Sequence, residues 1–256
     1  MPPESLQVVA LGLIQGATEL LPVSSSAHIA AIPQLLGWSV ASWPDERRKE
    51  LEVALHAGAL LALSPSLWRV RPDLRTLVLS LAPPVIVGYA LEKPIEARLG
   101  GPRGLAAGLL FGAAALATAD RAGGATSDSR GATLSRGTPG LALGAAQACA
   151  LFPGVSRTGA TLAAARALGY DRAGASRLSF GVAGPVLAGA TALKAWRGRR
   201  DADLRLVATG AGAAFAGTAV ALKLLGLERR RPLWPYAAER VALAGGILAL
   251  RYRRAP

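Results

Sequence analysis

Cysteine and charged side chains are both scarce in this chain. Cys149 is the one cysteine among 256 residues, so neither a disulfide within the chain nor a cysteine metal cluster can form. Only 18% of the residues are charged, whereas 52% are hydrophobic, and the mean hydropathy is +0.35. This balance is too apolar for an ordinary soluble domain and predicts an integral membrane protein.

Several long stretches of the sequence contain no charged residue. Each is long enough to cover most of a hydrocarbon core of roughly 30 Å as a helix. The stretches are residues 76–91, 104–119, 137–156, 178–193 and 206–222. The N-terminal residues also lack the basic region of a cleaved signal peptide, so we expect the first apolar segment to be retained.

Acidic residues are much rarer than basic ones, and the formal net charge is +13. The basic residues are scattered over the gaps between apolar stretches rather than gathered on one arm or face, which argues against nucleic acid as a partner. Contact with anionic lipid headgroups fits better, because each nearby Lys or Arg contributes about 1 kcal/mol at a charged bilayer surface. The lipid bilayer is therefore the expected partner.

Ten helical segments are predicted, and four of them are too short to cross a bilayer comfortably. The short ones flank Pro22 and Pro153, where a Pro and Ser cluster cannot continue a helix. We therefore expect about six transmembrane helices and two re-entrant helix-loop-helix hairpins whose tips line a cavity. The predicted segments are 5–21, 27–37, 51–67, 76–91, 104–119, 139–152, 159–169, 178–195, 206–226 and 236–250.

The two hairpin segments are diverged copies of one unit. Residues 11–38 align with residues 143–170 without a gap, at an offset of 132. Three predicted crossings separate the copies, so the hairpins should enter from opposite faces, as in an inverted-topology repeat. We predict one all-α membrane domain over residues 1–256, with halves at about 5–119 and 137–250 joined by a polar loop at 120–136.

Four ionisable side chains lie inside apolar segments, where each costs at least about 2.5 to 3.5 kcal/mol at the bilayer centre. They are Glu19, His28, His56 and Arg157. The first copy carries Glu19, Ser25 and His28, and the second carries Arg157, which suggests a composite site. A structural role is the alternative for each residue. Glu19 would then be a carboxylate at the membrane interface, His28 a helix cap, His56 a structural histidine and Arg157 a counter-ion of Glu19.

Both predicted tips have the composition of anion or phosphate sites. In residues 153–161 (PGVSRTGAT), Gly154 allows close backbone approach and Ser156, Thr158 and Thr161 place hydroxyls at a helix start. Arg157 adds a fork that matches phosphate oxygens. In the first tip, Ser24, Ser25 and Ser26 offer hydroxyls close to His28 and Glu19, which would suit an activated nucleophile with a base.

At these residues the chain resembles the bacterial undecaprenyl-diphosphate phosphatases linked to bacitracin resistance. The resemblance rests on residues 15–19 (QGATE) with 22–28 (PVSSSAH), and on 153–161 (PGVSRTGAT). Three departures stand out: Gln15 replaces the Glu that the pattern also allows, Thr158 replaces Ser, and His56 stands where Gln is expected. Gln15 removes one carboxylate that could bind a metal.

The resemblance implies removal of the terminal phosphate from undecaprenyl diphosphate, which yields a lipid carrier that cell-wall synthesis reuses. Arg157, Ser156, Thr158 and the rest of the second tip would hold the phosphate, and Ser25 is the preferred nucleophile, with Ser24 and Ser26 as rivals. His28 would act as base or acid. Glu19 would orient His28 or bind Mg²⁺ or Ca²⁺, and Gln15 would add a neutral ligand or a hydrogen bond.

The resemblance also implies a multi-pass protein of the bacterial inner membrane, with a site open to the periplasmic or outer side. A homo-oligomer is left open. A second class of function fits the same architecture. Inverted repeats with broken helices also describe transporters, so a carrier or flippase of a lipid phosphate or another anion is the alternative. A catalytically weak relative of the phosphatases is a third option.

Overall fold

The computed structural model describes residues 2–70, 72–122, 138–197, 203–228 and 232–254. Within these ranges the chain forms α-helices and one short 3-10 helix, with no strand. The helices are α1 (Glu4–Glu19), α2 (Ser25–Leu36), α3 (Asp45–Arg69), α4 (Leu74–Leu99), α5 (Pro102–Ala122), α6 (Thr138–Cys149), α7 (Arg157–Ala167), α8 (Arg172–Arg197), α9 (Leu204–Glu228) and α10 (Trp234–Arg254); the 3-10 helix is Ser39–Ser42.

All ten predicted helices are present, and the predicted ends err mainly where charged residues flank an apolar run. The third helix begins at Asp45 rather than near residue 51, because Asp45 and Glu46 suit the positive end of a helix dipole. The fourth continues to Leu99 rather than ending near residue 91. The polar loop predicted at 120–136 falls almost entirely outside the described residues, so the division into two halves stays a prediction.

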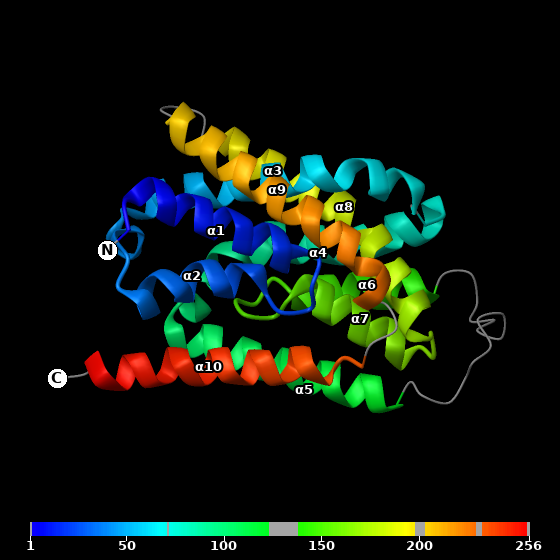
Figure 1. Ribbon diagram of the computed structural model, residues 1–256. Coiled ribbons are helices and arrows are strands. Elements are labelled where there is room, and N and C mark those ends of the chain that lie inside the picture. Colours follow the sequence, from blue (N-terminus) through cyan, green and yellow to red (C-terminus); the bar gives the residue numbers. More distant parts are fainter. Residues whose placement is uncertain (1, 71, 123–137, 198–202, 229–231, 255–256) are drawn as a thin grey trace.

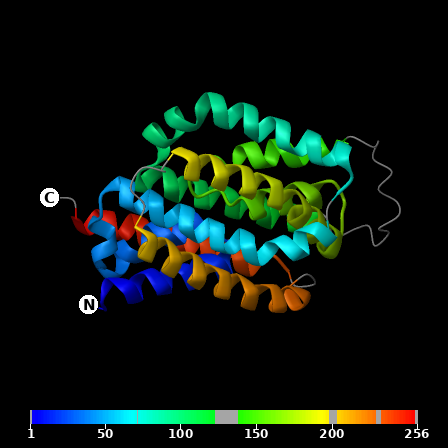
Figure 2. The same ribbon diagram turned by 90° about the horizontal axis from the view of Figure 1, so that it is seen from above.

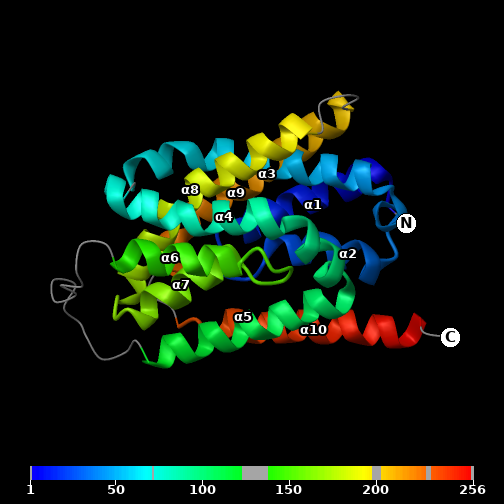
Figure 3. The same ribbon diagram turned by 180° about the vertical axis from the view of Figure 1, so that it is seen from behind.

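Two short hairpins enter the helical bundle from opposite ends (Figure 1). The helices of the first hairpin, α1 and α2, have 16 and 12 residues, and those of the second, α6 and α7, have 12 and 11. At 1.5 Å per residue they are about 17 to 24 Å long, shorter than a hydrocarbon core of roughly 30 Å. Their tips meet near the middle of the molecule (Figure 3).

The six longer helices surround the hairpins, and the bundle is that of a multi-pass membrane protein. Within the described residues, four segments are long and apolar enough to span a bilayer: α3, α4, α5 and residues 204–224 of α9. The prediction of six crossings also needs α8 and α10, which have 26 and 21 residues. Large apolar side chains such as Val85, Ile86 and Tyr89 are 63%, 67% and 94% exposed on the outer face of α4, as lipid contact requires.

Each hairpin is anchored to the opposite half of the chain. The first hairpin packs through α1 on α9, and the second packs through α6 on α4 (Figure 2). Glycine permits the first contact, because a Cβ atom at Gly16 would lie 2.2 Å from the carbonyl oxygen of Ala214. The two reciprocal contacts hold the tips in register.

Two prolines inside α4, Pro83 and Pro84, shape its contact with α6. Pro84 has no N–H, so the carbonyl of Ser80, four residues earlier, loses its partner within the helix. Gln147 of α6 replaces that partner by donating from Nε2 to Ser80 O over 2.9 Å. Gly144 lies against Pro83, so the freed backbone is covered closely rather than left unsatisfied in the bundle.

A buried carboxylate fixes the far end of the second hairpin. Asp120, at the end of α5, accepts hydrogen bonds from Arg172 Nε and Nη2 at 2.9 and 3.0 Å and from the N–H of Leu233 at 2.9 Å. Arg166 of α7 donates to the carbonyl oxygen of Asp120 over 3.1 Å. Asp120 thus links α5, α7, α8 and the start of α10, which positions the tip of α7 relative to α10.

Candidate active site

Both tips use strained or glycine backbone to turn sharply. Ser24 has φ +70°, a left-handed value that is uncommon for a residue with a side chain. Gly154 has φ +89°, and a Cβ atom there would lie 2.2 Å from Leu105 O on α5. Strain of this kind collects at functional sites, where the surrounding structure holds it in place. Gly154 therefore lets the second tip pack closely on α5, and its predicted role in phosphate binding stays a prediction.

Glu19 is the hub of the site. Its carboxylate is buried and accepts hydrogen bonds from Ser25 Oγ at 2.7 Å, Gln15 Nε2 at 3.1 Å and Arg157 Nη2 at 2.5 Å. Ser25 stands at the first position of α2, directly after the strained turn. The structure therefore joins acid, hydroxyl and guanidinium from both tips, which is the composite arrangement that the repeat suggested.

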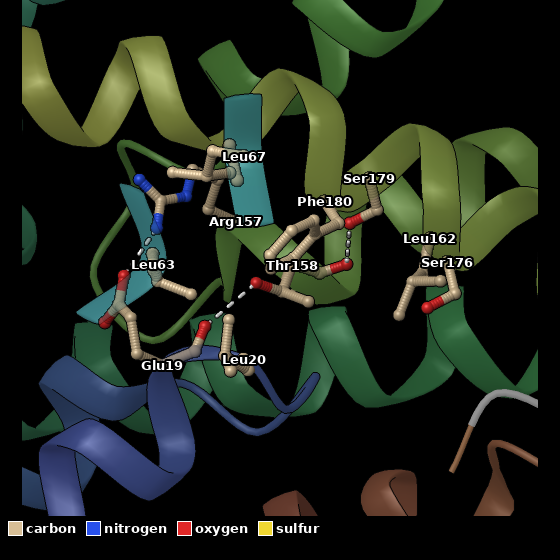
Figure 4. Close-up of a pocket in the computed structure, with 11 residues that line it drawn as sticks. Glu19, Leu20, Leu63, Leu67, Arg157, Thr158, Leu162, Ser176, Ser179 and Phe180 are labelled. Carbon is tan, nitrogen blue, oxygen red and sulfur yellow. Dashed lines mark hydrogen bonds and ion pairs between the residues drawn. The ribbon is translucent and has the colours of Figure 1, made fainter. Parts of the chain in front are cut away.

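The second tip lies against the end of α1. Thr158 donates from Oγ1 to the carbonyl oxygen of Glu19 over 3.2 Å, and Arg157 points toward the carboxylate of Glu19 (Figure 4). Ser156 caps α7, because its Oγ accepts from the N–H of Gly159 at 3.1 Å. The Ser156 hydroxyl can still donate to an anion at the start of this helix.

Thr161 lies one turn further along α7 and is buried. Its hydroxyl lies 2.6 Å from Ser179 Oγ of α8 and bonds to the carbonyl oxygens of Arg157 and Thr158 at 2.9 and 3.2 Å. These contacts hold the first turn of α7 against α8. Thr161 is predicted to bind phosphate, but in the structure its hydroxyl already has partners within the protein.

The three serines of the first tip differ in exposure. Ser24 is buried, Ser25 is half-buried and Ser26 is exposed. The hydroxyls of Ser24 and Ser26 lie 3.4 Å apart, and only Ser25 bonds to the carboxylate of Glu19. Ser25 is accordingly the serine with a proton acceptor in place.

The two histidines lie on different sides of this site. His28 contacts Glu239 of α10, with 3.0 Å between Nε2 and Oε1, and its Nδ1 lies 2.8 Å from Ser24 O. His56 of α3 approaches the site, with Nε2 3.9 Å from Glu19 Oε2. Glu19 therefore contacts Ser25 and His56, and the partner that orients His28 is Glu239.

Sequence reasoning missed two residues of α10, Glu239 and Arg240. Arg240 is fully buried, donates from Nε to Pro22 O over 2.7 Å and presses its guanidinium against Gly159. A Glu-Arg pair seven and eight residues after Pro232 looks like the interfacial start of a helix in sequence. One signal could have found it, because Arg240 directly precedes the uncharged run 241–250 of the same helix.

A pocket of about 410 Å³, including the open space at its mouth, extends from Glu19 and Arg157. Its polar end carries these two side chains with Thr158, Ser176 and Ser179 add two hydroxyls, and the other side chains that line it are apolar (Figure 4). The apolar lining includes Leu20, Leu63, Leu67, Leu162 and Phe180, from α3, α7, α8 and the end of α1. The lining thus combines charged groups at one end with a largely apolar wall, which matches the chemistry of an anionic head joined to an apolar tail.

The donor set for a metal is small. Among the described residues, no three His, Cys, Asp or Glu side chains lie together as a metal-binding group. Two side chains with oxygen donors are neighbours: Glu19, and Gln15, whose Nε2 donates to Glu19 Oε2 and whose Oε1 is buried without a hydrogen-bond partner among the described residues. One carboxylate and one amide suit Mg²⁺ only if substrate and water supply the remaining ligands.

Fold and site together define a multi-pass membrane protein in which a buried carboxylate contacts a serine hydroxyl and a guanidinium where two opposed hairpins meet. The chain belongs to the family described as bacitracin resistance protein BacA, whose sequence model matches residues 8–246.

Curated relatives agree with this assignment over nearly the whole chain. A protein named undecaprenyl-diphosphatase from Geobacter metallireducens is 37% identical over 273 residues, covering 95% of this chain and 97% of the relative. One of the same name from Geobacter sulfurreducens is 34% identical, covering 97% and 99%. Another, from Nitratidesulfovibrio vulgaris, is 34% identical and covers 94% and 96%.

Proposed function

We propose that the chain is an undecaprenyl-diphosphate phosphatase, a hydrolase that releases the terminal phosphate of a membrane polyprenyl diphosphate. One observation carries the proposal: Glu19 joins Ser25 and Arg157, so a nucleophile, its proton acceptor and a phosphate-binding cation occupy one buried point. Named relatives support the substrate, and the apolar pocket beside this point suits the start of a prenyl tail. The product would be undecaprenyl phosphate, the lipid carrier of peptidoglycan synthesis.

Arg157 is the group that first meets the phosphate. In the structure it pairs with Glu19, but its Nε atom is buried and has no hydrogen-bond partner among the described residues. A phosphate offers the planar fork two acceptors at once, so it competes well for Arg157. The hydroxyls of Ser156 and Thr158 and the start of α7 add donors beside it. Arg157 then stabilises the charge on the transferred phosphoryl oxygens.

Ser25 is the nucleophile in this account. Its Oγ forms a bond to the terminal phosphorus, its proton passes to Glu19, and the bond from phosphorus to the bridging oxygen breaks with the electron pair on the departing lipid phosphate. Water then attacks the phosphoserine. The bond from phosphorus to Oγ breaks, Oγ takes the proton back from Glu19, and inorganic phosphate leaves with the oxygen and both protons of the water.

A divalent cation, Mg²⁺ or Ca²⁺, is also proposed. Glu19 and Gln15 Oε1 would be its protein ligands, and the diphosphate would supply further oxygens. When bound, the ion neutralises charge on the diphosphate. The unpartnered Gln15 Oε1 supports this assignment, because a buried amide oxygen without a donor is costly unless something binds to it.

The protein is further proposed to lie in the bacterial inner membrane, with its site open to the periplasmic or outer side. Bacterial relatives support the compartment, and the resemblance in both signatures supports the outward opening. A homo-oligomer stays a prediction.

Phosphate release by purified protein tests the function. In detergent, the wild type should release inorganic phosphate from a C55 or C15 prenyl diphosphate, and Glu19→Ala should not. The matched control is Glu46→Gln, an exposed carboxylate at the start of α3. No release by the wild type, together with passage of labelled lipid phosphate across liposomes, would reject the enzyme in favour of a carrier.

A further inference from the structure

Two consecutive residues of α10 hold the serine tip from both sides. Arg240 Nε donates to Pro22 O over 2.7 Å, and Glu239 Oε1 lies 3.0 Å from His28 Nε2. The three serines of the tip lie between Pro22 and His28 in the chain. The start of α10 therefore fixes the segment that carries the nucleophile, although it is more than 200 residues away in sequence.

Both nitrogens of His28 face hydrogen-bond acceptors. Nδ1 lies 2.8 Å from the carbonyl oxygen of Ser24, which can only accept, so Nδ1 carries a hydrogen. Nε2 faces the carboxylate of Glu239. A ring between a carbonyl and a carboxylate is best satisfied when both nitrogens are protonated. In that form His28 has no lone pair with which to accept the proton of Ser25.

The neighbouring charges agree with this arrangement. Burial opposes the charged ring and so does Arg240 of α10, whereas the hydrogen bonds to Glu239 and to Ser24 O and the charge of Glu239 favour it. From α1, the carboxylate of Glu19 bonds to Ser25 and Arg157 rather than to the ring. The second oxygen of Glu239 is buried without a hydrogen-bond partner among the described residues, so His28 is the group that satisfies this carboxylate.

We propose that Glu239 is a positioning residue that holds the imidazole of His28 with hydrogens on both nitrogens and so makes it an acid. The use of this acid rests on the proposed function. As the bond from phosphorus to the bridging oxygen breaks, the departing oxygen takes the proton held between Nε2 and Glu239, and the electron pair of the N–H bond stays on the ring. The ring takes up a proton from the bulk solvent before the next turnover.

Nuclear magnetic resonance tests the proposal without any need for activity. The chain has two histidines, so ¹⁵N-histidine labelling of a His56→Gln protein leaves the ring of His28 as one signal set. At neutral pH, both ring nitrogens of His28 should be protonated in the protein that keeps Glu239. After Glu239→Gln, only Nδ1 should be protonated. Identical spectra would overturn the proposal, whether or not the protein hydrolyses a prenyl diphosphate.

Kinetics then separate positioning from a merely structural role. Glu239→Gln should lower kcat about 10²-fold with little change in KM, at the lower end of what acid catalysis contributes. In a His28→Ala protein the same change should cost nothing further, and Glu239→Asp should regain part of the rate. An equal loss in both backgrounds would show that Glu239 acts only through folding and would refute its action through His28.

Discussion

Arg157 Nη2 and Glu19 Oε1 lie 2.5 Å apart, although the two residues are 138 positions apart in the chain. Each belongs to a different hairpin tip, and the hairpins enter the bundle from opposite ends. The side chain of Glu19 is 4% exposed and that of Arg157 is 18% exposed. An ion pair shielded this well cannot be a solvated surface contact, so the two tips form one site.

The first prediction concerns the energy of this pair. Arg157→Met and Glu19→Gln should each lower stability by about 1 to 3 kcal/mol, because each leaves a buried charge without its partner. The double variant should lose less than the sum of the two, with a coupling of about 0.5 to 3 kcal/mol. Thermal unfolding in detergent measures the cycle. Strict additivity would mean that the pair does not form in the membrane protein.

The serine series distinguishes the nucleophile from its neighbours. Ser25→Ala should lower phosphate release at least about 10³-fold, and a trapped phosphoserine seen by mass spectrometry in the wild type should vanish. Ser26→Ala is the matched control, because Ser26 is exposed and its hydroxyl does not contact Glu19. Near-normal release by Ser25→Ala would instead favour direct attack by water.

Gln15 offers a direct test of the metal assignment. Gln15→Glu places a second carboxylate beside Glu19 and should lower the Mg²⁺ or Ca²⁺ concentration needed for half-maximal activity, because hard cations prefer charged oxygen ligands. A chelator should inactivate the wild type reversibly. If the chelator has no effect and the variant shows no change in metal dependence, the proposed cation is wrong.

Helix packing gives a prediction that is independent of catalysis. A Cβ atom at Gly58 of α3 would lie 2.0 Å from Ala211 O of α9, so Gly58→Ala should separate the helices and cost about 1 to 3 kcal/mol. Gly212 is one residue away from this contact and has open space around its Cα, so Gly212→Ala should be neutral or slightly stabilising. Equal unfolding midpoints for the two variants would contradict the described contact.

The sequence predicts much of the fold because the features that define each hairpin lie within one short segment of the chain. Pro22 and Pro153 interrupt the helices, the apolar runs beside them are too short to cross a bilayer, and the repeat aligns Ser24 with Ser156. The closeness of Glu19 and Arg157 is also suggested by the sequence, since both are ionisable residues that one copy has and the other lacks. Local patterns and internal symmetry were sufficient for these features.

The partners of the histidines could not be predicted in the same way. His28 is three residues from Ser25 and looks like its base, yet the helix turns the ring toward Glu239 of α10. His56 reaches Glu19 from α3. Such contacts depend on how α3 and α10 pack around the hairpins, and no periodicity within one segment encodes that packing. The contacts of Arg240 with Pro22 and Gly159 have the same origin.

Phosphate release by Arg157→Ala, measured on protein whose helical content and elution volume match the wild type, tests the composite site most directly. The account predicts at least about a 10³-fold loss, since the cation that binds and stabilises the phosphoryl group comes from the second tip. Release at the wild-type rate would contradict it, because the first tip would then suffice alone.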